Sequence, residues 1–556
     1  MCGILTLIKM NYNEKDINSF EISLNKMKYR GPDNTNIIKK KNILLGHNRL
    51  KILDLSEKSN QPFEYKNFSL IFNGCIYNFK ELRNELKNKY TFKTTGDTEV
   101  LMYSLIEWGE KAFNKIDGMY AFVFYDGKKI ITSVDYFGEK PLYIYKDENE
   151  ILISSEIAPL KIYLKDKLII KKNPIQFKEF YHLGFLLGEE TVYKNIFKLS
   201  NKKIYSIDEN LNIKKLDKID LKYKKFNVTF KDIHEELLNS LKNRLNSDVP
   251  LCLFLSTGID SALLATLIKK ELKIDLDFYS FYNENEKKSK EYLLNFTNYL
   301  GVKTKIISNE EQNFEYKNFK KAYEDLNECD TYFPYDQMCK YIKQNTDIKV
   351  ILTGLGADEI FFGYNKYKYF YKFRRLYKLN DKLYKFFNFF GDKLNLNILK
   401  KSKFFTGKNF TKFLKIKNND YNINYDQIEE FNEEQQLFLS ARNFDINNTM
   451  PISLIPAIER ASMRSSLETR SPYLSKKLFD LVNCIEDYSM FFKEQKYIQK
   501  KILRKYLPEK FIPNVKEGFF YNNPNLFNSN DDLQKKYNLK FTNYRYNQRA
   551  EIYNLF

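Results

Sequence analysis

The pattern of apolar residues changes once along this chain, whose 556 residues are too many for a single ordinary hydrophobic core. Up to about residue 161, short apolar runs alternate with turn residues, a pattern that is typical of a sheet-rich domain. One amphipathic helix, Phe79–Leu86, is expected among these strands. The apolar runs lie at residues 43–45, 70–72, 121–124 and 151–154.

A different pattern follows a polar, weakly periodic stretch between about residues 197 and 227, where we place the domain junction. Beyond it, apolar strands are expected at residues 251–255, 276–281 and 349–352, and a helix at residues 261–272. Strands that alternate with helices indicate an α/β domain with a doubly wound parallel sheet. We therefore expect one domain at residues 1–210 and a second at residues 228–556.

Composition limits the classes of function. Apolar residues make up 43% and charged residues 29% of the chain, as in folded globular proteins. No apolar run approaches the roughly 20 residues of a membrane span, and the amino-terminal residues lack a signal-peptide pattern, so a cytoplasmic location is expected. The net charge of +20 is spread along the chain. In the basic, aromatic stretch at residues 365–416, helices of a variable insertion are favoured over a nucleic-acid surface, and no nucleic-acid partner is expected.

Six scattered cysteines and three histidines argue against a zinc site or a disulfide framework, which draws attention to Cys2. Removal of Met1 would give Cys2 both a thiol and a free amino group. The pKa of an α-amino group is about 7.7–8, so the amine can accept the thiol proton near neutral pH. Alone, a cysteine at this position is more often incidental than catalytic.

Ordered motifs after Cys2 decide between these two interpretations. They resemble the glutaminase domain of asparagine synthetases, a type 2 glutamine amidotransferase domain of the N-terminal nucleophile hydrolases. The resemblance implies an α+β domain built as an αββα sandwich. The motifs are Arg30-Gly31-Pro32-Asp33, His47-Asn48-Arg49-Leu50, Asn73-Gly74-Cys75-Ile76-Tyr77-Asn78, Gly96-Asp97-Thr98-Glu99 and Asp117-Gly118-Met119-Tyr120.

The resemblance also implies roles for single residues. Asn73 and Gly74 would stabilise the oxyanion that forms when Cys2 attacks glutamine. Arg49 would hold the glutamine α-carboxylate, and Asp97 would bind its α-ammonium group. Cys75 stands where relatives usually have Glu, so one substrate contact would be missing and weaker glutamine binding is expected.

A second group of motifs begins after the strand expected at residues 251–255. The turn Ser256-Thr257-Gly258-Ile259-Asp260-Ser261 resembles the pyrophosphate-binding loop of ATP pyrophosphatases, and the start of a helix offers backbone N–H groups to an anion. Further motifs resemble the asparagine synthetase domain with its helical additions, so the resemblance covers nearly the whole chain. They lie at residues 351–364, 461–463, 466–474, 500–504 and 516–519.

By this resemblance, Asp260 and Asp358 would hold Mg²⁺ against the phosphates of ATP, because a hard cation prefers carboxylate oxygens. Lys500 would neutralise charge as pyrophosphate leaves, although Lys496 and Lys501 lie close enough to leave the register open. The nucleotide would contact residues of the loop and of neighbouring strands: Leu255, Ser256, Gly258, Asp260, Ser261, Ser280, Thr353 and Gly354.

The sequence thus predicts an ATP-dependent carbon–nitrogen ligase. Cys2 would release ammonia from glutamine, and the ammonia would attack an adenylated carboxylate of aspartate to give asparagine, AMP, pyrophosphate and glutamate. The resemblance allows a homodimer. Leu355 replaces a usual acidic residue, Thr257 a glycine and Ser475 an aspartate. These differences leave open another acceptor, such as a uronic acid of a surface polysaccharide, or an impaired regulatory paralogue.

Overall fold

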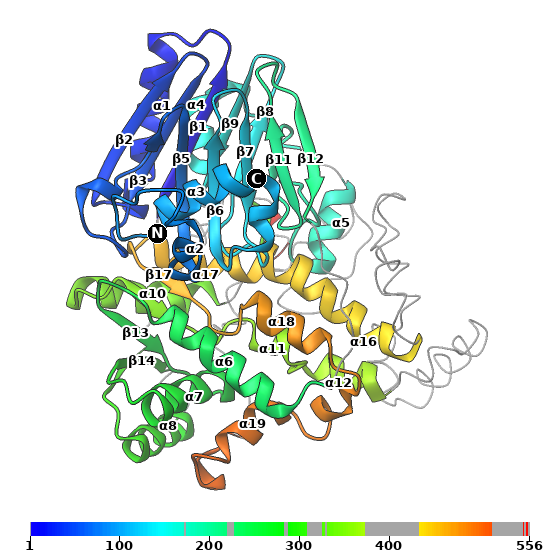
Figure 1. Ribbon diagram of the computed structural model, residues 1–556. Coiled ribbons are helices and arrows are strands. Elements are labelled where there is room, and N and C mark those ends of the chain that lie inside the picture. The colour runs from blue at the N-terminus through cyan, green and yellow to red at the C-terminus, as the bar shows by residue number, and fades with distance from the viewer. Residues whose placement is uncertain are drawn as a thin grey trace.

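The computed structural model describes residues 2–171, 174–218, 227–282, 287–308, 325–328, 331–372, 433–513, 549 and 552–553. Two antiparallel six-stranded sheets form the amino-terminal part, and one parallel five-stranded sheet lies in the carboxy-terminal part (Figure 1). The sequence prediction of an α+β domain followed by a doubly wound α/β domain is therefore confirmed.

The first sheet has the strand order β10-β8-β9-β1-β3-β2, and the second has the order β12-β11-β7-β6-β5-β4. The first comprises β1 (Gly3–Lys9), β2 (Asn34–Lys40), β3 (Ile43–Arg49), β8 (Tyr143–Lys146), β9 (Glu150–Ser154) and β10 (Ile196–Lys198). The second comprises β4 (Phe63–Tyr65), β5 (Phe68–Ile76), β6 (Gly118–Tyr125), β7 (Ile130–Val134), β11 (Lys203–Ile207) and β12 (Ile213–Asp217).

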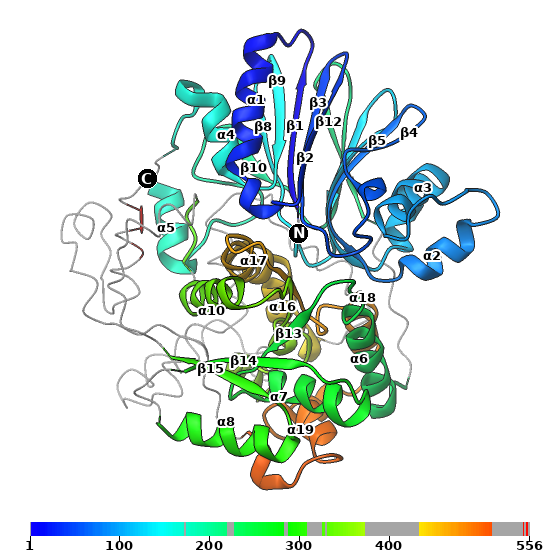
Figure 2. The ribbon, with the colours of Figure 1, turned by 90° about the vertical axis from the view of Figure 1, so that its left-hand side faces the viewer.

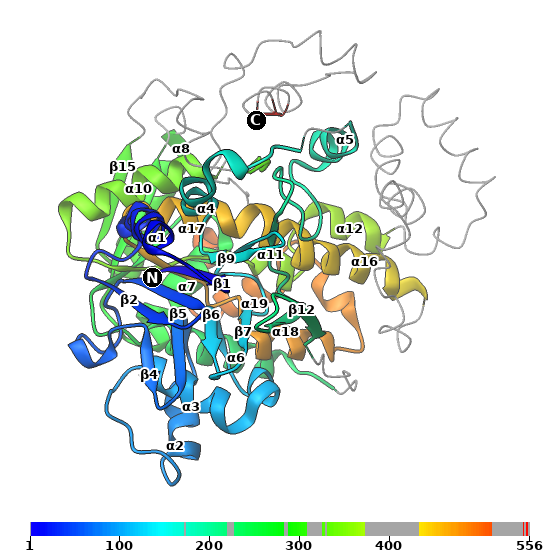
Figure 3. The same ribbon diagram turned by 90° about the horizontal axis from the view of Figure 1, so that it is seen from above.

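Alternation of side chains along β1 explains why the two sheets pack face to face. Ile4 and Ile8 enter the core between the sheets, whereas Leu5 and Leu7 pack in the cluster that contains Phe20 of the covering helix α1. A strand with apolar residues on both faces must be covered on both, because successive side chains point to opposite sides. Seen from above, helices cover the outer face of each sheet, which gives the αββα layering (Figure 3).

Helices α1 (Glu14–Lys26) and α4 (Ile157–Leu164) cover the first sheet, and α2 (Phe79–Leu86) and α3 (Thr98–Trp108) cover the second. The sequence pattern identified α2 with its observed bounds but none of the other helices, α5 (Pro174–Leu183) included. The expectation of a single helix was wrong. In α3, eight consecutive residues from Thr98 to Leu105 are buried, so its sequence shows no polar face from which a helical period could be recognised.

The carboxy-terminal sheet has the order β15-β14-β13-β16-β17, with every neighbouring pair parallel. Its strands are β13 (Leu251–Phe254), β14 (Asp277–Tyr282), β15 (Thr304–Ser308), β16 (Val350–Leu352) and β17 (Glu468–Arg470). The described helices are α6 (Phe230–Arg244), α7 (Ile259–Thr266), α8 (Lys287–Leu300), α10 (Tyr332–Asn345), α11 (Ala357–Ile360), α12 (Asn365–Lys372), α16 (Glu433–Phe444), α17 (Ile455–Met463), α18 (Lys476–Asn483) and α19 (Tyr497–Leu503).

Helices α10 and α17 lie between the parallel sheet and the amino-terminal sandwich (Figure 2). A single apolar cluster joins Leu152 and Tyr143 of the sandwich to Ile458 and Ala461 of α17 and to Phe254 of the parallel sheet. The two domains therefore share a continuous buried core, and their relative position is set by side-chain packing.

Of the basic stretch expected as a helical insertion, residues 365–372 form α12, and the remainder lies outside the described residues. Residues 516–519 lie outside them as well. Among the described helices, none combines the length and the apolar composition that crossing a membrane requires.

Candidate functional site

Cys2 lies at the beginning of β1, buried at the boundary between the two domains, where Figure 1 places the amino end of the chain beside β17. Its backbone N donates a 2.8 Å hydrogen bond to Asn73 Oδ1, and its carbonyl oxygen accepts from Arg30 Nε at 3.1 Å. Burial raises the pKa of the Cys2 thiol, and the positive charges of the chain terminus and Arg49 partly oppose that rise. An internal base is therefore needed to form the thiolate.

A cavity beside Cys2 brings the residues of the first predicted site together. Arg49, Gly74, Cys75 and Asp97 all line it. The other lining residues are Leu50, Ile52, Leu53, Gln61, Phe72 and Thr98 of the same domain and Glu468 and Arg470 of the carboxy-terminal domain.

Asn73 and Gly74 occupy β5 opposite Ala121 and Tyr120 of β6. The side-chain Nδ2 of Asn73 is buried and has no hydrogen-bond partner among the described residues, whereas its Oδ1 holds Cys2. A buried donor without a partner is costly, and at this place it is available to a developing oxyanion.

Arg49 is held rigidly. Its Nη1 donates to the carbonyl oxygen of Ser56 at 2.7 Å and to Asn60 Oδ1 at 2.8 Å, and its Nη2 donates to the carbonyl oxygen of Asp54. The guanidinium group thus presents a fixed positive charge to the cavity, with part of its hydrogen-bonding capacity already used by the loop.

Asp97 and Cys75 face the same cavity with different charges. Burial raises the pKa of Asp97 to about 6, even though its Oδ2 accepts a 2.8 Å hydrogen bond from the backbone N of Ile76. Burial also raises the pKa of the Cys75 thiol, which keeps that side chain neutral. Asp97 can therefore carry a negative charge near neutral pH, and Cys75 cannot.

The second predicted site is the turn between β13 and α7. Leu255 N extends the β13 ladder by donating to the carbonyl oxygen of Tyr279 at 2.8 Å. Ser261 Oγ lies 2.8 Å from Ser256 Oγ and accepts from Ser256 N at 2.9 Å, and Gly258 N donates to Ser256 Oγ at 3.1 Å. These bonds close the loop on itself, so its shape does not depend on a bound anion.

The two predicted metal ligands converge on one lysine. Lys496 Nζ lies 2.5 Å from Asp260 Oδ2 and 2.8 Å from Asp358 Oδ1. Lys496 has a left-handed backbone conformation, with φ of 57° and ψ of 40°, which for a residue with a side chain is a strain often kept at functional sites. Two carboxylates this close together suit a Mg²⁺ ion, which proteins hold through one or two carboxylates together with substrate phosphates. Such an ion would take the place that the ammonium group of Lys496 occupies between them.

The other predicted nucleotide residues surround this pair. Gly354 lies so close to Asp260 that an added Cβ would be 3.2 Å from the Asp260 Cβ. Thr353 Oγ1 is buried without a partner among the described residues, and Ser280 is buried in β14. Lys500, predicted to neutralise pyrophosphate, lies instead against Glu494 at 3.2 Å, and Lys496 one helical turn earlier occupies the place between the aspartates.

Three residues differ from those that relatives usually have: Leu355, Ser475 and Thr257. Leu355 packs partly buried against both large apolar clusters, and its carbonyl oxygen accepts a bond from Ser471 Oγ. Ser475 caps α18 by accepting from Leu478 N at 3.3 Å. Thr257 lies in the loop between Ser256 and Gly258, where nothing in the structure explains the replacement of glycine.

Glu468 and Arg470 were not identified as site residues from the sequence. They belong to β17, which is more than 390 residues beyond Asn73 in the chain, and no local pattern connects them with Cys2. The motif that contains them was the available signal, but it pointed only to the second site.

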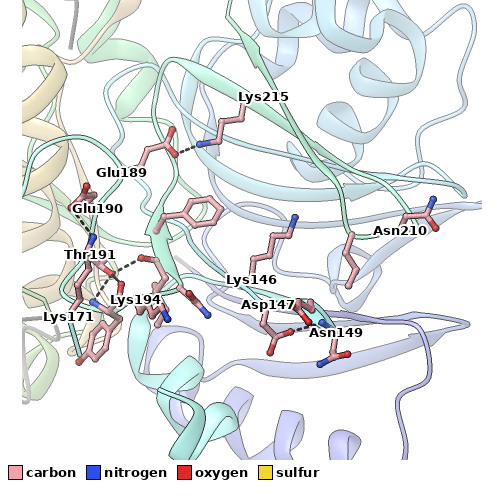
Figure 4. A pocket seen from close by; sticks show the side chains of 16 residues that line it. Lys146, Asp147, Asn149, Lys171, Glu189, Glu190, Thr191, Lys194, Asn210 and Lys215 are labelled. Carbon is pink, nitrogen blue, oxygen red and sulfur yellow. Dashed lines mark hydrogen bonds and ion pairs between the residues drawn. The ribbon is translucent and has the colours of Figure 1, made fainter. Parts of the chain in front are cut away.

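A roomier cavity of about 1060 Å³ lies elsewhere, between the turn at residues 147–149 and strands β10 and β12 (Figure 4). Its charged side chains are partly paired with one another: Lys215 with Glu189 at 2.5 Å and Lys171 with Glu190 at 3.8 Å. It contains no cysteine and lies apart from both predicted sites, so we assign it no catalytic role.

Gly74 offers a direct test of the geometry next to Cys2. Its φ is +152°, and a Cβ would lie 2.1 Å from the carbonyl oxygen of Met119, so Gly74→Ala combines backbone strain with a backbone clash. We expect it to lower the free energy of unfolding by about 2–5 kcal/mol. The matched control is Gly109→Ala. Gly109 also has a positive φ, of +52°, but a Cβ added there would have no atom within 4 Å. Its expected loss is about 1–3 kcal/mol. Equal losses in denaturant titrations would contradict the proposed close approach.

Comparisons with known proteins find relatives of both domains. A family model described as a glutamine amidotransferase domain matches residues 1–216, and one described as asparagine synthase matches residues 232–550. Asparagine synthetase [glutamine-hydrolyzing] 1 of Bacillus subtilis is 27% identical over 93% of this chain and 87% of its own length. Asparagine synthetase B [glutamine-hydrolyzing] of Escherichia coli is 28% identical over 49% of this chain and 45% of its own.

Solved structures give a more distant likeness. A Bacillus subtilis glutamine phosphoribosylpyrophosphate amidotransferase matches with a TM-score of 0.30 and 13% identity, over 64% of this chain and 81% of that one, which is too weak to support an argument. The family models cover both domains in order, and the second matches more than half of the chain. The chain belongs to the glutamine-hydrolysing asparagine synthetase family.

Proposed function

We propose that this protein joins ammonia from glutamine to a carboxylate that it has activated with ATP, and that aspartate is the acceptor. The observation that supports this most strongly is the combination of two polar sites in one chain, one at the domain boundary and one within the carboxy-terminal domain. Buried Cys2 has an unpaired Asn73 donor beside it, and the segment that follows β17 reaches the second site, where the hydroxyl of Tyr473 donates to the carbonyl oxygen of Asp260 at 2.8 Å.

In the first half-reaction, the thiolate of Cys2 attacks the side-chain amide carbon of glutamine. After Met1 is removed, the free amine of Cys2 accepts the thiol proton and delivers it to the departing ammonia. Asn73 Oδ1, which already accepts from the Cys2 nitrogen, orients that amine, and Asn73 Nδ2 stabilises the oxyanion. Water then hydrolyses the thioester and releases glutamate.

In the second half-reaction, the acceptor carboxylate attacks the α-phosphorus of ATP and displaces pyrophosphate. A Mg²⁺ ion held by Asp260 and Asp358 would supply charge neutralisation for the phosphates. Lys496, which lies between these carboxylates, is placed to bind the leaving pyrophosphate, and we propose it for the role first given to Lys500. Ammonia then attacks the acyl-adenylate to give the amide and AMP.

A second acceptor is supported by one observation. Leu355, which replaces a usual acidic residue, packs against apolar clusters and brings no charge to the nucleotide site. A carboxylate without the ammonium group of aspartate, such as a uronic acid, needs no such charge. A panel of carboxylates distinguishes the two acceptors.

The direct experiment supplies purified protein with glutamine, ATP, Mg²⁺ and either aspartate or a uronic acid, and measures AMP and amide products. Cys2→Ala should reduce glutamine-driven synthesis at least about a thousandfold and leave ammonia-driven synthesis intact. Cys484→Ala, which changes another buried cysteine, is the control. The proposal would be contradicted if mass spectrometry of the intact protein showed that Met1 is retained, or if no carboxylate led to AMP formation.

The dependence of glutamine hydrolysis on pH should report Asp97. Because burial raises its pKa to about 6, Asp97 carries its charge only above that pH, so binding of the glutamine ammonium group should weaken on acidification. The KM for glutamine should rise as the pH falls from 7 to 5, by up to about tenfold for each pH unit below the pKa. Asp97→Asn should give a high KM at every pH. A KM in the wild type that does not change over this range would contradict the assignment.

Two lysines one helical turn apart can be separated by substitution. Lys496→Gln should lower ammonia-driven AMP formation by at least about a hundredfold, because it removes the cation between Asp260 and Asp358. Lys500→Gln should change it by less than about threefold, because Lys500 pairs with the partly exposed Glu494. Thermal unfolding of both variants serves as the folding control. The reverse order of the two effects would restore the role to Lys500.

A further inference from the structure

The cavity beside Cys2 contains two charged side chains from the other domain. Glu468 and Arg470 lie at the two ends of the short strand β17, both almost completely buried, and both line the cavity together with Cys2, Arg49 and Asp97. The mechanism above uses neither of them. Charged groups are seldom buried unless they are paired or functional, so their place in this cavity calls for an explanation.

Arg470 is a fixed support for Glu468. Its Nε donates to Glu468 Oε1 at 2.7 Å, and its Nη1 donates to the carbonyl oxygens of Arg244 at 2.9 Å and Asn246 at 2.7 Å. Its Nη2 is buried without a partner among the described residues. The guanidinium group is therefore held by three hydrogen bonds, and its Nη2 remains available as a donor beside the cavity.

Glu468 is a negative charge in that cavity. Burial would raise its pKa, but Arg470 and then the positive chain terminus outweigh burial and bring the pKa below its ordinary value. The charge of Glu468 in turn contributes to the raised pKa of Asp97, so the two carboxylates are close enough to repel each other. A cation bound between them would relieve that repulsion, and the ammonium group of an amino acid is such a cation.

We propose that Glu468 binds the α-ammonium group of glutamine together with Asp97, and that Arg470 positions Glu468 for this contact. The carboxy-terminal domain then completes the substrate site of the amino-terminal domain. This inference rests on the proposed glutamine hydrolysis at Cys2. Neutral Cys75, which lines the same cavity, cannot supply this charge.

The backbone connects this contact to the nucleotide site. Leu352 of β16 pairs with Arg470 of β17, and Thr353 N donates to the carbonyl oxygen of Arg470 at 2.9 Å. Ser471 Oγ then bonds the carbonyl oxygen of Leu355, and the hydroxyl of Tyr473 donates to the carbonyl oxygen of Asp260 at 2.8 Å. The strand that carries Glu468 is thus hydrogen-bonded to the segments that carry the nucleotide residues.

Calorimetric titration tests the contact without requiring turnover. The parent is the full chain with Cys2→Ala, titrated with glutamine and with glutaramic acid, which is glutamine without its amino group. In the parent, glutamine should bind at least about tenfold more tightly than glutaramic acid, as expected for a charge-assisted hydrogen bond. Adding Glu468→Gln should weaken glutamine binding at least about tenfold and leave glutaramic acid binding nearly unchanged, so the preference should fall by the same factor.

Two further variants distinguish binding from folding. Glu271→Gln is the control, because Glu271 is a partly buried carboxylate of the same domain that bonds His234 and Tyr506 away from the cavity. Glu468→Asp, which keeps the charge on a shorter side chain, should retain part of the preference even if Glu468→Gln folds poorly.

The outcomes separate the two claims. A parent that binds no glutamine would overturn glutamine hydrolysis at this site and the present inference with it. If the parent binds glutamine, and both Glu468 variants still prefer glutamine to glutaramic acid as strongly as the parent does, the inference alone is overturned. Weakened binding of both ligands in equal measure would show a structural pair that does not contact the ammonium group, which also overturns it.

Discussion

One buried guanidinium group joins the backbone of Cys2 to both domains. Arg30 Nε donates to the carbonyl oxygen of Cys2, its Nη1 lies 2.6 Å from Glu156 of the same domain, and its Nη2 pairs with Glu459 of α17. Taking a charge out of water is expensive, so Arg30 is stable there only while both carboxylates are present. The position of the Cys2 backbone consequently depends on the docking of the carboxy-terminal domain, and either domain alone would leave unpaired charges at the boundary.

Much of the fold could be predicted from local patterns. The strand at Leu251–Phe254 with its following turn, and the amphipathic helix Phe79–Leu86, carry the periodicity that burial on one face or in a sheet imposes. Helix α3 was not predicted because it is buried on nearly all sides and its sequence therefore lacks a helical period. The register of the lysines near α19 could not be predicted either. Lys496 precedes the helix in a left-handed conformation that turns its side chain to Asp260 and Asp358, and no sequence pattern indicates that conformation.

Contacts across the domain boundary could not be predicted in the same way. Arg30 with Glu459, and Glu468 with the cavity beside Cys2, join residues several hundred positions apart, and no short motif records such a partnership. The three-dimensional packing decides which elements meet. Strand β17 shows the consequence, since two of its three residues at the edge of one sheet line the cavity beside Cys2 and its backbone bonds to Thr353 of the second predicted site.

The burial of Cys2 has a consequence for biosynthesis. The residue is only 7% exposed, and Asn73 and Arg30 bond its backbone from two sides, so the folded sandwich encloses the bond that an aminopeptidase would have to cut before Cys2. On the proposed mechanism, Met1 must then be removed before the domain folds, while the chain is still being synthesised. At roughly 5–20 residues per second, Glu459 leaves the ribosome on the order of tens of seconds later. The enzyme would therefore acquire its reactive amine well before the partner that fixes it in place has been synthesised.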